Sequence, residues 1–526
     1  MTSRTLAGGA AALLLGVAGA VGSADVASPE RPRAQVDVRP ATATGRVVAV
    51  PEGGSLQAAL EAAQPGDVIT LDPGATYTGP FTLPRKVGAG WITVRTGAAD
   101  AVFPAAGVRV NPSHAGLMPK LVAAAEAVLA TAPGAHHYRF IGLEIMPRPG
   151  AALTNLVRLG TVETREDDLP HHLLFERCYV HGDPRRQTRR GIALNSRWTA
   201  VVDSYLSDFK DAHADSQAVA GWAGSGPFRL ENNYLEAAGE NVMFGGADPA
   251  IADLVPSDIE IRRNHFAKPL AWKMGEPEFA GAAWAVKNLL ELKNARRVLI
   301  DGNLFERAWA HAQSGFAIVF TVRNQDGRAP WSTVEDVTFV NNVVRHAGAG
   351  VNLLGRDDVR PSRPSARLLI ANNLFEDIGG PRWGGSGRLF QILDGVSGLV
   401  IEHNTALQRG PIIVAEGRPH PGFVFANNIV VHNEYGIIGT GTARGTGTLD
   451  AYFPAALVRR NVLVGASAAL YPPDNFFPAS LDEVGFTDPA GGDYRLTGRY
   501  RRAATTGRDV GVDVRSLTGL HTRSTR

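Results

Sequence analysis

A short phrase recurs along the middle of this chain. In each copy an alternating apolar run ends in Asn, and an aromatic or aliphatic residue follows two positions later, as in Ile-Asp-Gly-Asn-Leu-Phe at 300–305. The copies end at Asn233, Asn264, Asn303, Asn342, Asn373, Asn404, Asn428 and Asn461, with steps of 31, 39, 39, 31, 31, 24 and 33 residues. Two degenerate copies lie upstream, at 175–179 and 201–205. Such a period is typical of chains that stack one structural unit on the next.

Each unit contains two or three short runs with strand-like alternation, such as 336–339 and 367–370. None contains an amphipathic run long enough for a helix, which argues against helical solenoids. Leucine-rich repeats have shorter, more regular units, and a propeller blade needs four strands. The repeat therefore predicts an all-β fold, a right-handed single-stranded parallel β-helix with one repeat per coil and coils stacked about 4.8 Å apart.

The repeated Asn has a structural role in such a fold. A tight bend between two strands needs a residue that tolerates a left-handed backbone, and Asn does. Stacked Asn side chains can also hydrogen-bond from coil to coil and satisfy amides inside the bend. We therefore assign these residues to architecture. Cys178 occupies the Asn position of its own coil and is expected to stack in the same ladder as a small buried group.

The two ends of the repeat region carry further signals. Residues 55–63 have helical periodicity, 64–67 break it, and 68–71 form a strand-like run. This order resembles the N-terminal module of pectate-lyase-type β-helices, in which a helix caps the open end. Residues 493–496 and 507–513 resemble the closing segments of such proteins. The resemblance implies a cap and first coil at 47–90, a parallel β-helix at 91–465, and a closing segment and tail at 466–526.

The first 24 residues have the pattern of a secretory signal peptide. Arg4 supplies a positive start, residues 6–21 are apolar and small, and 22–24 offer a cleavage point. Residues 25–46, rich in Pro, Ala and Arg, are predicted to be a linker. We expect a secreted protein, extracellular or periplasmic, with no membrane span and a monomeric state. The net charge of +2, without a basic block, gives no reason to expect a nucleic-acid partner.

A second strand in each coil points to the face on which chemistry is expected. Alternation in 289–293 and 317–323 places apolar side chains inside. The side chains placed outside, on one face, are Glu291, Lys293, Thr321, Arg323, Asn352 and Gln391. Long insertions follow several of these strands, at 247–257, 268–286, 324–334 and 356–366, and bring Trp272, Trp284, Trp331 and Trp383 nearby. Aromatic planes there suit sugar rings, or they simply cover the sheet.

Two cations stand out on this face. Lys293 and Arg323 are 30 residues apart, about one coil, so they should stack on adjacent coils. Here the chain resembles the alginate-lyase and chondroitinase-B type of polysaccharide lyase, which carries a Lys on one coil and an Arg on the next. The resemblance implies that Lys293 is the base and that Arg323 assists as acid or charge stabiliser. The chain departs from that family at Asn324, where a His is usual.

Other residues of the same region would complete such a site. A uronate lyase must neutralise the substrate carboxylate, remove the proton beside it and help the C4 oxygen leave. Lys287, Gln325, Asn352 and Trp331 are candidates for binding substrate, with Asn241 as a further candidate ligand. Glu240 and Glu291 could hold a Ca²⁺ that bridges to the substrate.

Several alternatives remain open. Lys293 and Arg323 could form a plain salt-bridge ladder with Glu291. A glycoside hydrolase would use carboxylates of the same face, and Asp357-Asp358 or Asp211 and Asp215 around His213 are the candidates, although Asp357-Asp358 also suits a turn cap. A non-catalytic carbohydrate-binding or surface protein is the third possibility. The pairs His136-His137 and His171-His172 lack metal-ligand spacing with Cys or carboxylate partners, so no zinc site is predicted. The favoured function is a polysaccharide lyase acting on an acidic glycan.

Overall fold

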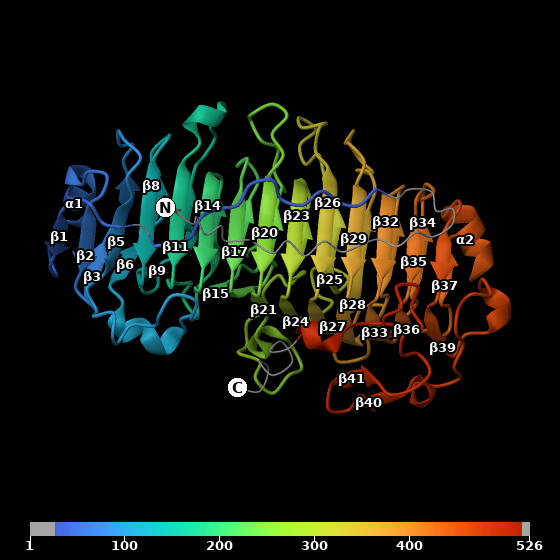
Figure 1. The fold of residues 1–526 in the computed structure, drawn as a ribbon. Helices are drawn as coiled ribbons and strands as arrows, with labels where there is room; N and C mark the ends of the chain where they lie inside the picture. The colour runs from blue at the N-terminus through green and yellow to red at the C-terminus, as the bar shows by residue number, and fades with distance from the viewer. Residues whose placement is uncertain (1–26, 41, 518–526) are drawn as a thin grey trace, which may run out of the picture.

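The chain winds into stacked coils that build three long parallel sheets. The computed structural model describes residues 27–40 and 42–517. Sheet A has 14 strands, sheet B has 13 and sheet C has 12, and every pairing within them is between successive coils (Figure 1). The predicted all-β, right-handed parallel β-helix with an N-terminal capping helix is confirmed.

Sheet A comprises β1 (Val47–Val50), β2 (Val68–Leu71), β5 (Ile92–Thr96), β8 (His136–Ile141), β11 (His171–Glu176), β14 (Arg197–Val202), β17 (Phe228–Glu231), β20 (Ser257–Arg262), β23 (Ala295–Asp301), β26 (Val334–Val340), β29 (Ala366–Ala371), β32 (Ser397–Glu402), β35 (Val424–Ala426) and β38 (Leu457–Arg459). Sheet B comprises β3 (Thr76–Thr78), β6 (Lys120–Ala123), β9 (Glu144–Pro147), β12 (Tyr179–His181), β15 (Tyr205–Phe209), β18 (Tyr234–Ala237), β21 (His265–Ala267), β24 (Leu304–Ala308), β27 (Val343–Ala347), β30 (Leu374–Ile378), β33 (Thr405–Gln408), β36 (Ile429–Val431) and β39 (Val462–Val464).

Sheet C comprises β4 (Phe81–Leu83), β7 (Leu129–Thr131), β10 (Leu153–Leu159), β13 (Thr188–Leu194), β16 (Gln217–Gly221), β19 (Glu240–Phe244), β22 (Leu290–Leu292), β25 (Phe316–Thr321), β28 (Ala349–Leu354), β31 (Phe390–Leu393), β34 (Ile413–Glu416) and β37 (Ile437–Gly439). A separate antiparallel pair near the end of the chain comprises β40 (Phe486–Asp488) and β41 (Asp493–Leu496).

The N-terminal end is closed by helix α1 (Leu56–Ala62). Ser55 caps it, because the Ser55 hydroxyl accepts a hydrogen bond from the Ala58 N–H at 3.1 Å. Leu56 and Leu60 of the helix are buried in the main core. Sheet A begins one strand earlier than the expected start at residue 68, since β1 pairs in parallel with β2. A second helix, α2 (Thr446–Tyr452), was not predicted and packs near the C-terminal coils.

The Asn ladder exists and continues one step further, to Asn475. Each amide Nδ2 donates to the Oδ1 of the next ladder Asn at 2.9–3.0 Å. The expected backbone conformation was wrong: from Asn233 to Asn461 the residue before each ladder Asn, not the Asn itself, is left-handed, with φ of 57° at Asn341 and 56° at Asn372. Cys178 lies in the ladder position as predicted, buried, with its N–H donating to Ser204 Oγ at 3.0 Å.

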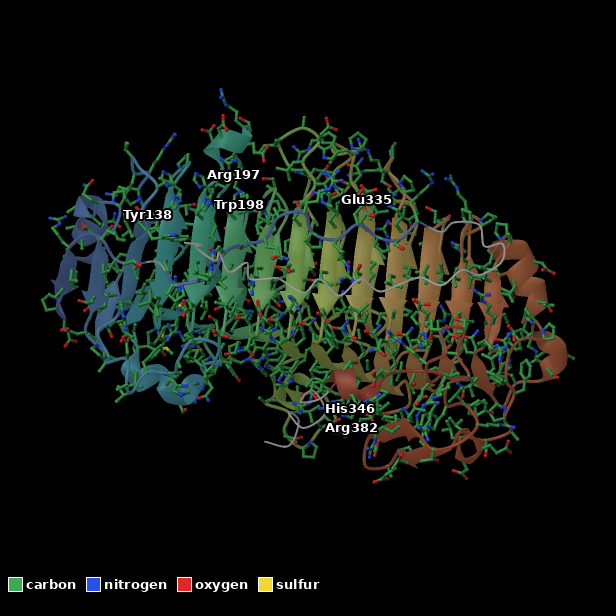
Figure 2. The ribbon with its side chains drawn as sticks, viewed as in Figure 1. Tyr138, Arg197, Trp198, Glu335, His346 and Arg382 are labelled. Carbon is green, nitrogen blue, oxygen red and sulfur yellow. The ribbon has the colours of Figure 1, made fainter. Side chains whose placement is uncertain are left out.

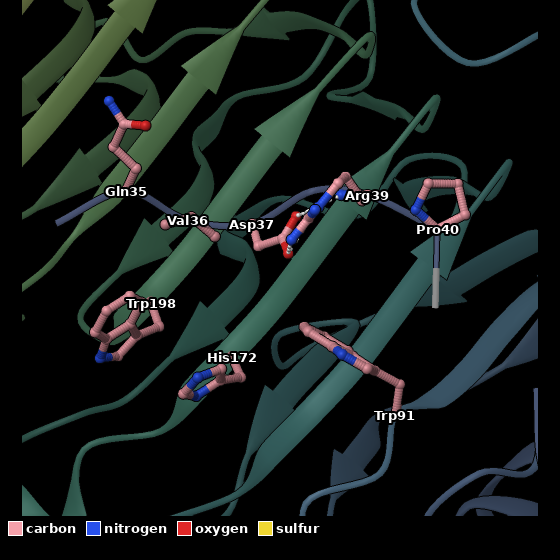
Figure 3. A pocket seen from close by; sticks show the side chains of 8 residues that line it. All are labelled: Gln35, Val36, Asp37, Arg39, Pro40, Trp91, His172 and Trp198. Atoms are coloured by element: carbon pink, nitrogen blue, oxygen red, sulfur yellow. Dashed lines mark hydrogen bonds and ion pairs between the residues drawn. The ribbon is translucent and has the colours of Figure 1, made fainter. Parts of the chain in front are cut away.

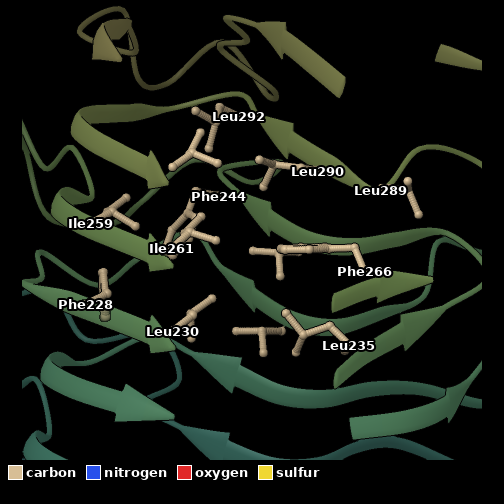
Figure 4. Close-up of a cluster of buried hydrophobic side chains, with 14 of the residues drawn as sticks. Phe228, Leu230, Leu235, Phe244, Ile259, Ile261, Phe266, Leu289, Leu290 and Leu292 are labelled. Carbon is tan, nitrogen blue, oxygen red and sulfur yellow. The ribbon is translucent and has the colours of Figure 1, made fainter. Parts of the chain in front are cut away.

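Side chains from all three sheets fill the interior. Figure 4 shows Leu290 and Leu292 of β22 facing Phe244, Ile259 and Ile261 from neighbouring strands. The inward positions predicted by alternation are fully buried, and each such side chain contributes roughly 1.5–3 kcal/mol by leaving water. The outward positions of the same strands are thereby held in fixed register on the surface of sheet C.

Chain segments from the two ends cover parts of the other two sheets. The segment 27–40, within the stretch predicted as a linker, crosses sheet A (Figure 1). Val36 in this segment packs on Leu174, Ala200 and Val202, and the Arg33 N–H donates to Asp258 Oδ1 at 2.9 Å. On sheet B, three C-terminal side chains (Tyr494, Val512 and Leu517) pack on three strand residues (Leu304, Val343 and Leu374).

The predicted signal peptide at 1–24 lies outside the described residues. Within residues 27–40 and 42–517, no helix has the length and apolar character needed to cross a membrane.

Candidate active site on sheet C

Lys293 and Arg323 lie on adjacent coils, as the repeat predicts. Lys293 directly follows β22, and Arg323 comes two residues after β25, the next strand of sheet C. The Arg323 N–H donates to the Lys293 carbonyl at 2.9 Å, so the two backbones are paired at this point. The two cations therefore extend from the same edge of sheet C.

A pocket of about 410 Å³ opens over these strands. Its polar lining, contributed by three consecutive coils, comprises Glu291, Lys293, Gln313, Ser314, Thr321, Arg323 and Asn352. Asn352 is in register with Val319 of the coil before, and Gln391 follows on the next coil, where its Nε2 donates to Asn352 Oδ1 at 3.3 Å. The pocket thus runs along the solenoid axis, the direction in which an extended polymer would lie.

Lys293 is held at the pocket wall by Glu291. Its Nζ lies 3.5 Å from Glu291 Oε1, and the side chain is 16% exposed. Glu291 in turn accepts a hydrogen bond from Asn288 Nδ2 at 3.0 Å, and Asn288 also donates to Gln313 Oε1 at 3.1 Å. Gly245 permits the close approach of the coil before, because a Cβ there would lie 2.9 Å from Lys293 Cβ. The backbone and Cβ of Lys293 are therefore held in place, whereas its Nζ makes only a long ion pair with Glu291, at 3.5 Å.

Arg323 is paired with two carboxylates from the next coil. Its NH1 lies 3.2 Å from Asp357 Oδ1 and also contacts Asp358. Asp357 accepts backbone hydrogen bonds from Val359 at 2.9 Å and Asn324 at 2.8 Å. Burial opposes ionisation of Asp357, but these N–H groups and Arg323 together hold its pKa below the ordinary value. Asp357 is thus a turn cap that also orients Arg323, the structural role expected for it.

A second charged group adjoins the pocket. Lys287 Nζ lies 2.6 Å from Asp215 Oδ1 and 3.6 Å from Glu240 Oε1. Glu240 is fully buried, and its Oε2 accepts a hydrogen bond from Gln217 Nε2 at 2.8 Å. Burial, followed by the charges of Glu291 and Asp215, raises the pKa of Glu240 to about 7. The two glutamates proposed as metal ligands therefore influence each other electrostatically.

The structure separates the candidate residues into three groups. Lys293, Arg323, Glu291 and Asn352 line the pocket together. Lys287 and Glu240 form the adjoining charged group. Gln325 is exposed in the loop after Arg323, and Trp331 Nε1 donates to Leu254 O at 3.0 Å, which directs the polar edge of the indole to loop 247–257.

One interpretation made from the sequence needs correction, and one open alternative is decided. Asn241 is fully buried, and its Nδ2 donates to the Leu235 and Ala267 carbonyls at 2.7 and 2.9 Å, so it serves the fold and does not reach substrate. Trp272 and Trp383 are almost fully buried in an apolar cluster with Trp309, and therefore cover the sheet.

Some residues in and around the pocket were not found from the sequence. Gln217 donates to Glu240 and Asn288 donates to Glu291, while Gln313 of the pocket lining accepts from Asn288. None of the three belongs to a motif. The only signal that could have found Gln217 is coil register, because it pairs with Glu240 one coil later. Asp215, considered only for a hydrolase, is the ion-pair partner of Lys287.

The histidine pairs lie closer together than their spacing along the chain indicates. His136-His137 and His171-His172 were assessed by spacing along the chain, but the fold stacks the two pairs on adjacent coils of sheet A. One ring nitrogen from each of His136, His137 and His171 lies within 4.8 Å of the other two.

Comparison with known proteins supports the architecture. No family model matches the sequence, and no curated protein matches it. Among solved structures, the PL6 family alginate lyase AlyGC superposes with a TM-score of 0.52 at 16% identity, over 90% of this chain and 57% of that one. The catalytic unit of a GH87 α-1,3-glucanase from Streptomyces thermodiastaticus strain HF3-3 gives 0.47 at 12% identity, over 81% and 70%.

A mannuronic acid specific polysaccharide family 6 lyase from human gut microbiota gives a TM-score of 0.43 at 13% identity, over 84% of this chain and 83% of that one. The chain spans little more than half the length of AlyGC. At these identities the likeness to AlyGC is a likeness of fold: the protein is a right-handed parallel β-helix.

Proposed function

We propose that this protein is a secreted polysaccharide lyase that cleaves an acidic, uronate-containing glycan by β-elimination. The observation that carries the proposal is the placement of Lys293 and Arg323 on adjacent coils in one pocket of about 410 Å³. Both cations extend from rigid strands, and the pocket runs along the axis of the solenoid. The signal-peptide pattern of residues 1–24 supports secretion. Secretion suits this function, because a polymer too large to enter a cell must be cut outside it.

The chemistry assigns one task to each of the two side chains. Lys293 acts as the neutral amine: its Nζ takes the proton from C5, beside the carboxylate, and the electron pair of the C–H bond forms a C4=C5 double bond. The C4–O bond breaks with its electron pair on O4, which leaves and takes a proton from solvent. At 3.5 Å from Glu291, Lys293 can turn toward substrate without breaking a short hydrogen bond. Arg323 pairs with the uronate carboxylate and stabilises the charge that develops there, a task suited to its planar guanidinium.

Calcium is the metal that this site would fit. Glu240 Oε1 is buried and has no hydrogen-bond partner among the described residues, although Lys287 Nζ lies 3.6 Å from it, so an ion would replace the ammonium at this oxygen. Glu240 and Glu291 would hold the ion, since Ca²⁺ prefers oxygen ligands. When bound, it would neutralise the substrate carboxylate alongside Arg323.

A glycoside hydrolase is the second candidate. It is favoured by three carboxyl groups, those of Asp215, Glu240 and Glu291, which adjoin the same pocket, and by the pKa of about 7 at Glu240, which would keep one of them protonated as an acid. Glu240 is fully buried, however, so a substrate would have to reach it past Lys287.

A product assay distinguishes these functions. The purified protein is incubated with alginate, chondroitin, dermatan and pectate while absorbance near 235 nm and reducing ends are followed together. Alginate heads the panel because AlyGC, which shares the fold, is an alginate lyase. We expect the two signals to rise together on at least one uronate glycan. Reducing ends without new absorbance would refute the lyase and indicate a hydrolase, and neither signal on any glycan would indicate binding without turnover.

A further inference from the structure

Four histidines form a compact array on sheet A, away from the pocket of sheet C. His136 and His137 open β8, and His171 and His172 open β11, the next strand of the sheet. The ring of His136 stacks on that of His171 with centroids 4.7 Å apart, and the ring of His137 stacks on that of His172 at 4.4 Å. The array is therefore two coils high and two rings wide.

A backbone feature brings both rings of each pair to the same face. The second His of each pair is left-handed, with φ of 59° at His137 and 53° at His172. Within each pair the two Nδ1 atoms meet, at 2.8 Å for His136 and His137 and at 2.7 Å for His171 and His172. Because a strand normally points successive side chains to opposite faces, this arrangement depends on the local distortion.

The same backbone position holds opposite charges in later coils. Arg297 Nε lies 2.6 Å from Asp258 Oδ1, and Arg367 Nε lies 2.6 Å from Asp336 Oδ1. In those coils the stacked position is satisfied by ion pairs. In the histidine coils it is occupied by His137 and His172, whose rings stack, and each shares a proton with the Nδ1 of the histidine before it. Imidazole nitrogens are ligands that transition metals favour.

We propose that His136, His137 and His171 form a binding site for a divalent transition-metal ion of the Zn²⁺ class. One ring nitrogen from each lies within 4.8 Å of the other two. His136 Nε2 lies 2.9 Å from the Lys86 carbonyl, which can only accept, so Nε2 carries the proton and Nδ1 keeps its lone pair. A backbone carbonyl behind a ligating imidazole is the usual way in which proteins orient such a ligand.

The dimensions suit the ion. Two nitrogens on a tetrahedral Zn²⁺, each about 2.0–2.1 Å from the metal, are about 3.3 Å apart. The His136–His137 contact of 2.8 Å would open by about half an ångström as the ion replaces the shared proton. Purely imidazole donors favour Zn²⁺, Cu²⁺ or Ni²⁺ over Ca²⁺ or Mg²⁺, which take oxygen ligands. His172 is placed to hold the ring of His171 through their Nδ1 contact.

The three proposed ligands are half-buried, and a pocket lies beside the array. His172 lines a pocket of about 480 Å³ together with Trp91, Trp198 and the crossing segment 35–40 (Figure 3). Arg197, labelled in Figure 2, is in register with His171 and is a cation beside the array.

Metal binding to the untagged protein tests the proposal. After treatment with EDTA and gel filtration, Zn²⁺ is titrated calorimetrically at pH 7.5, and bound metal is counted by mass spectrometry. We expect one ion per chain, with affinity reduced about 100-fold or more in the double variant His136→Gln/His171→Gln. The control is His213→Gln, which changes an exposed histidine outside the array and should bind as the unaltered protein does.

A second readout guards against misfolding of the double variant. Electron paramagnetic resonance of the Cu²⁺-loaded unaltered protein should show hyperfine coupling to about three imidazole nitrogens. Three results would each overturn the proposal. The first is binding of less than 0.1 Zn²⁺ per chain at ~100 µM free Zn²⁺. The others are a Cu²⁺ spectrum dominated by oxygen ligands, and a folded double variant that binds Zn²⁺ as tightly as the unaltered protein.

Discussion

At the residue scale, Glu240 is the group whose environment most changes its chemistry. It is fully buried, and burial, followed by Glu291 and Asp215, raises its pKa from the ordinary 4.5 to about 7. The folded protein therefore keeps a proton between pH 4.5 and 7 that the unfolded chain has lost. The stability this gives is fully present below pH 4.5 and is lost as the pH rises through 7.

The variant Glu240→Gln should remove this dependence. Gln cannot ionise, and its carbonyl can still accept from Gln217 Nε2. Urea unfolding at pH 5 and pH 8 should show the unaltered protein losing on the order of 2 kcal/mol more than the variant over that interval. Glu126→Gln, at an exposed position, is the control and should follow the unaltered protein. Parallel pH profiles for the unaltered protein and Glu240→Gln would show that the buried carboxyl is ionised throughout.

At the scale of the element, the Asn ladder ties one coil to the next. Asn303 is fully buried, and its Nδ2 donates to Asn342 Oδ1 at 3.0 Å and to Ile261 O at 2.8 Å. Its Oδ1 accepts from the Asn264 N–H and Nδ2 at 2.9 and 3.0 Å. Removing this amide would leave buried groups on both neighbouring coils without partners.

We therefore expect Asn303→Ala to lower the free energy of unfolding by about 2–4 kcal/mol. The comparison variant is Asn341→Gly, one residue before a ladder Asn, whose left-handed backbone suits Gly. Its half-buried side chain bonds Asp301 Oδ1 and Asn372 Nδ2 at 2.7 Å outside the ladder, so the change should cost about 1 kcal/mol, less than Asn303→Ala. Equal losses for the two variants, measured by urea unfolding, would mean that the ladder has no special role.

The same element shows where sequence reasoning succeeds and where it stops. Period-2 alternation correctly placed Leu290 and Leu292 inside and Glu291 and Lys293 outside, because burial alone decides that pattern. The left-handed residue was assigned to the ladder Asn, whereas it is the residue before it. Arg263 and His403 also take that conformation, so residue type could not reveal a backbone geometry that hydrogen bonds of the neighbouring coil impose.

At the scale of the whole molecule, the three sheets of the solenoid differ in how far other segments of the chain cover them. Sheet A is crossed by the segment 27–40, and sheet B is partly covered by residues near the C-terminus (Figure 1). The outer face of sheet C carries the pocket with Lys293 and Arg323. These coverings arise from contacts between residues far apart in sequence, which no local pattern encodes, so they could not be foreseen.

Coil register predicted which residues of the candidate site lie on adjacent coils, but not which side chains contact one another. The 30-residue step from Lys293 to Arg323 correctly placed them on adjacent coils, because the coil length was read from the ladder. Partners such as Asn288 and Gln313 were missed, since their contacts depend on side-chain direction. The histidine array was missed for a related reason: its members are 35 residues apart, a spacing that means contact only once the coil is known.

The most direct test of the central claim is the rate of absorbance increase at 235 nm for Lys293→Met and Arg323→Gln on the glycan that the unaltered protein cleaves. The matched control is Lys120→Met on sheet B, because Lys120 lies 3.4 Å from Glu144, much as Lys293 lies 3.5 Å from Glu291. We predict that Lys293→Met lowers kcat by about 10²- to 10⁴-fold, that Arg323→Gln lowers kcat/KM, and that the control retains full activity. If both site variants instead cleave at the unaltered rate, the site lies elsewhere and the account is contradicted.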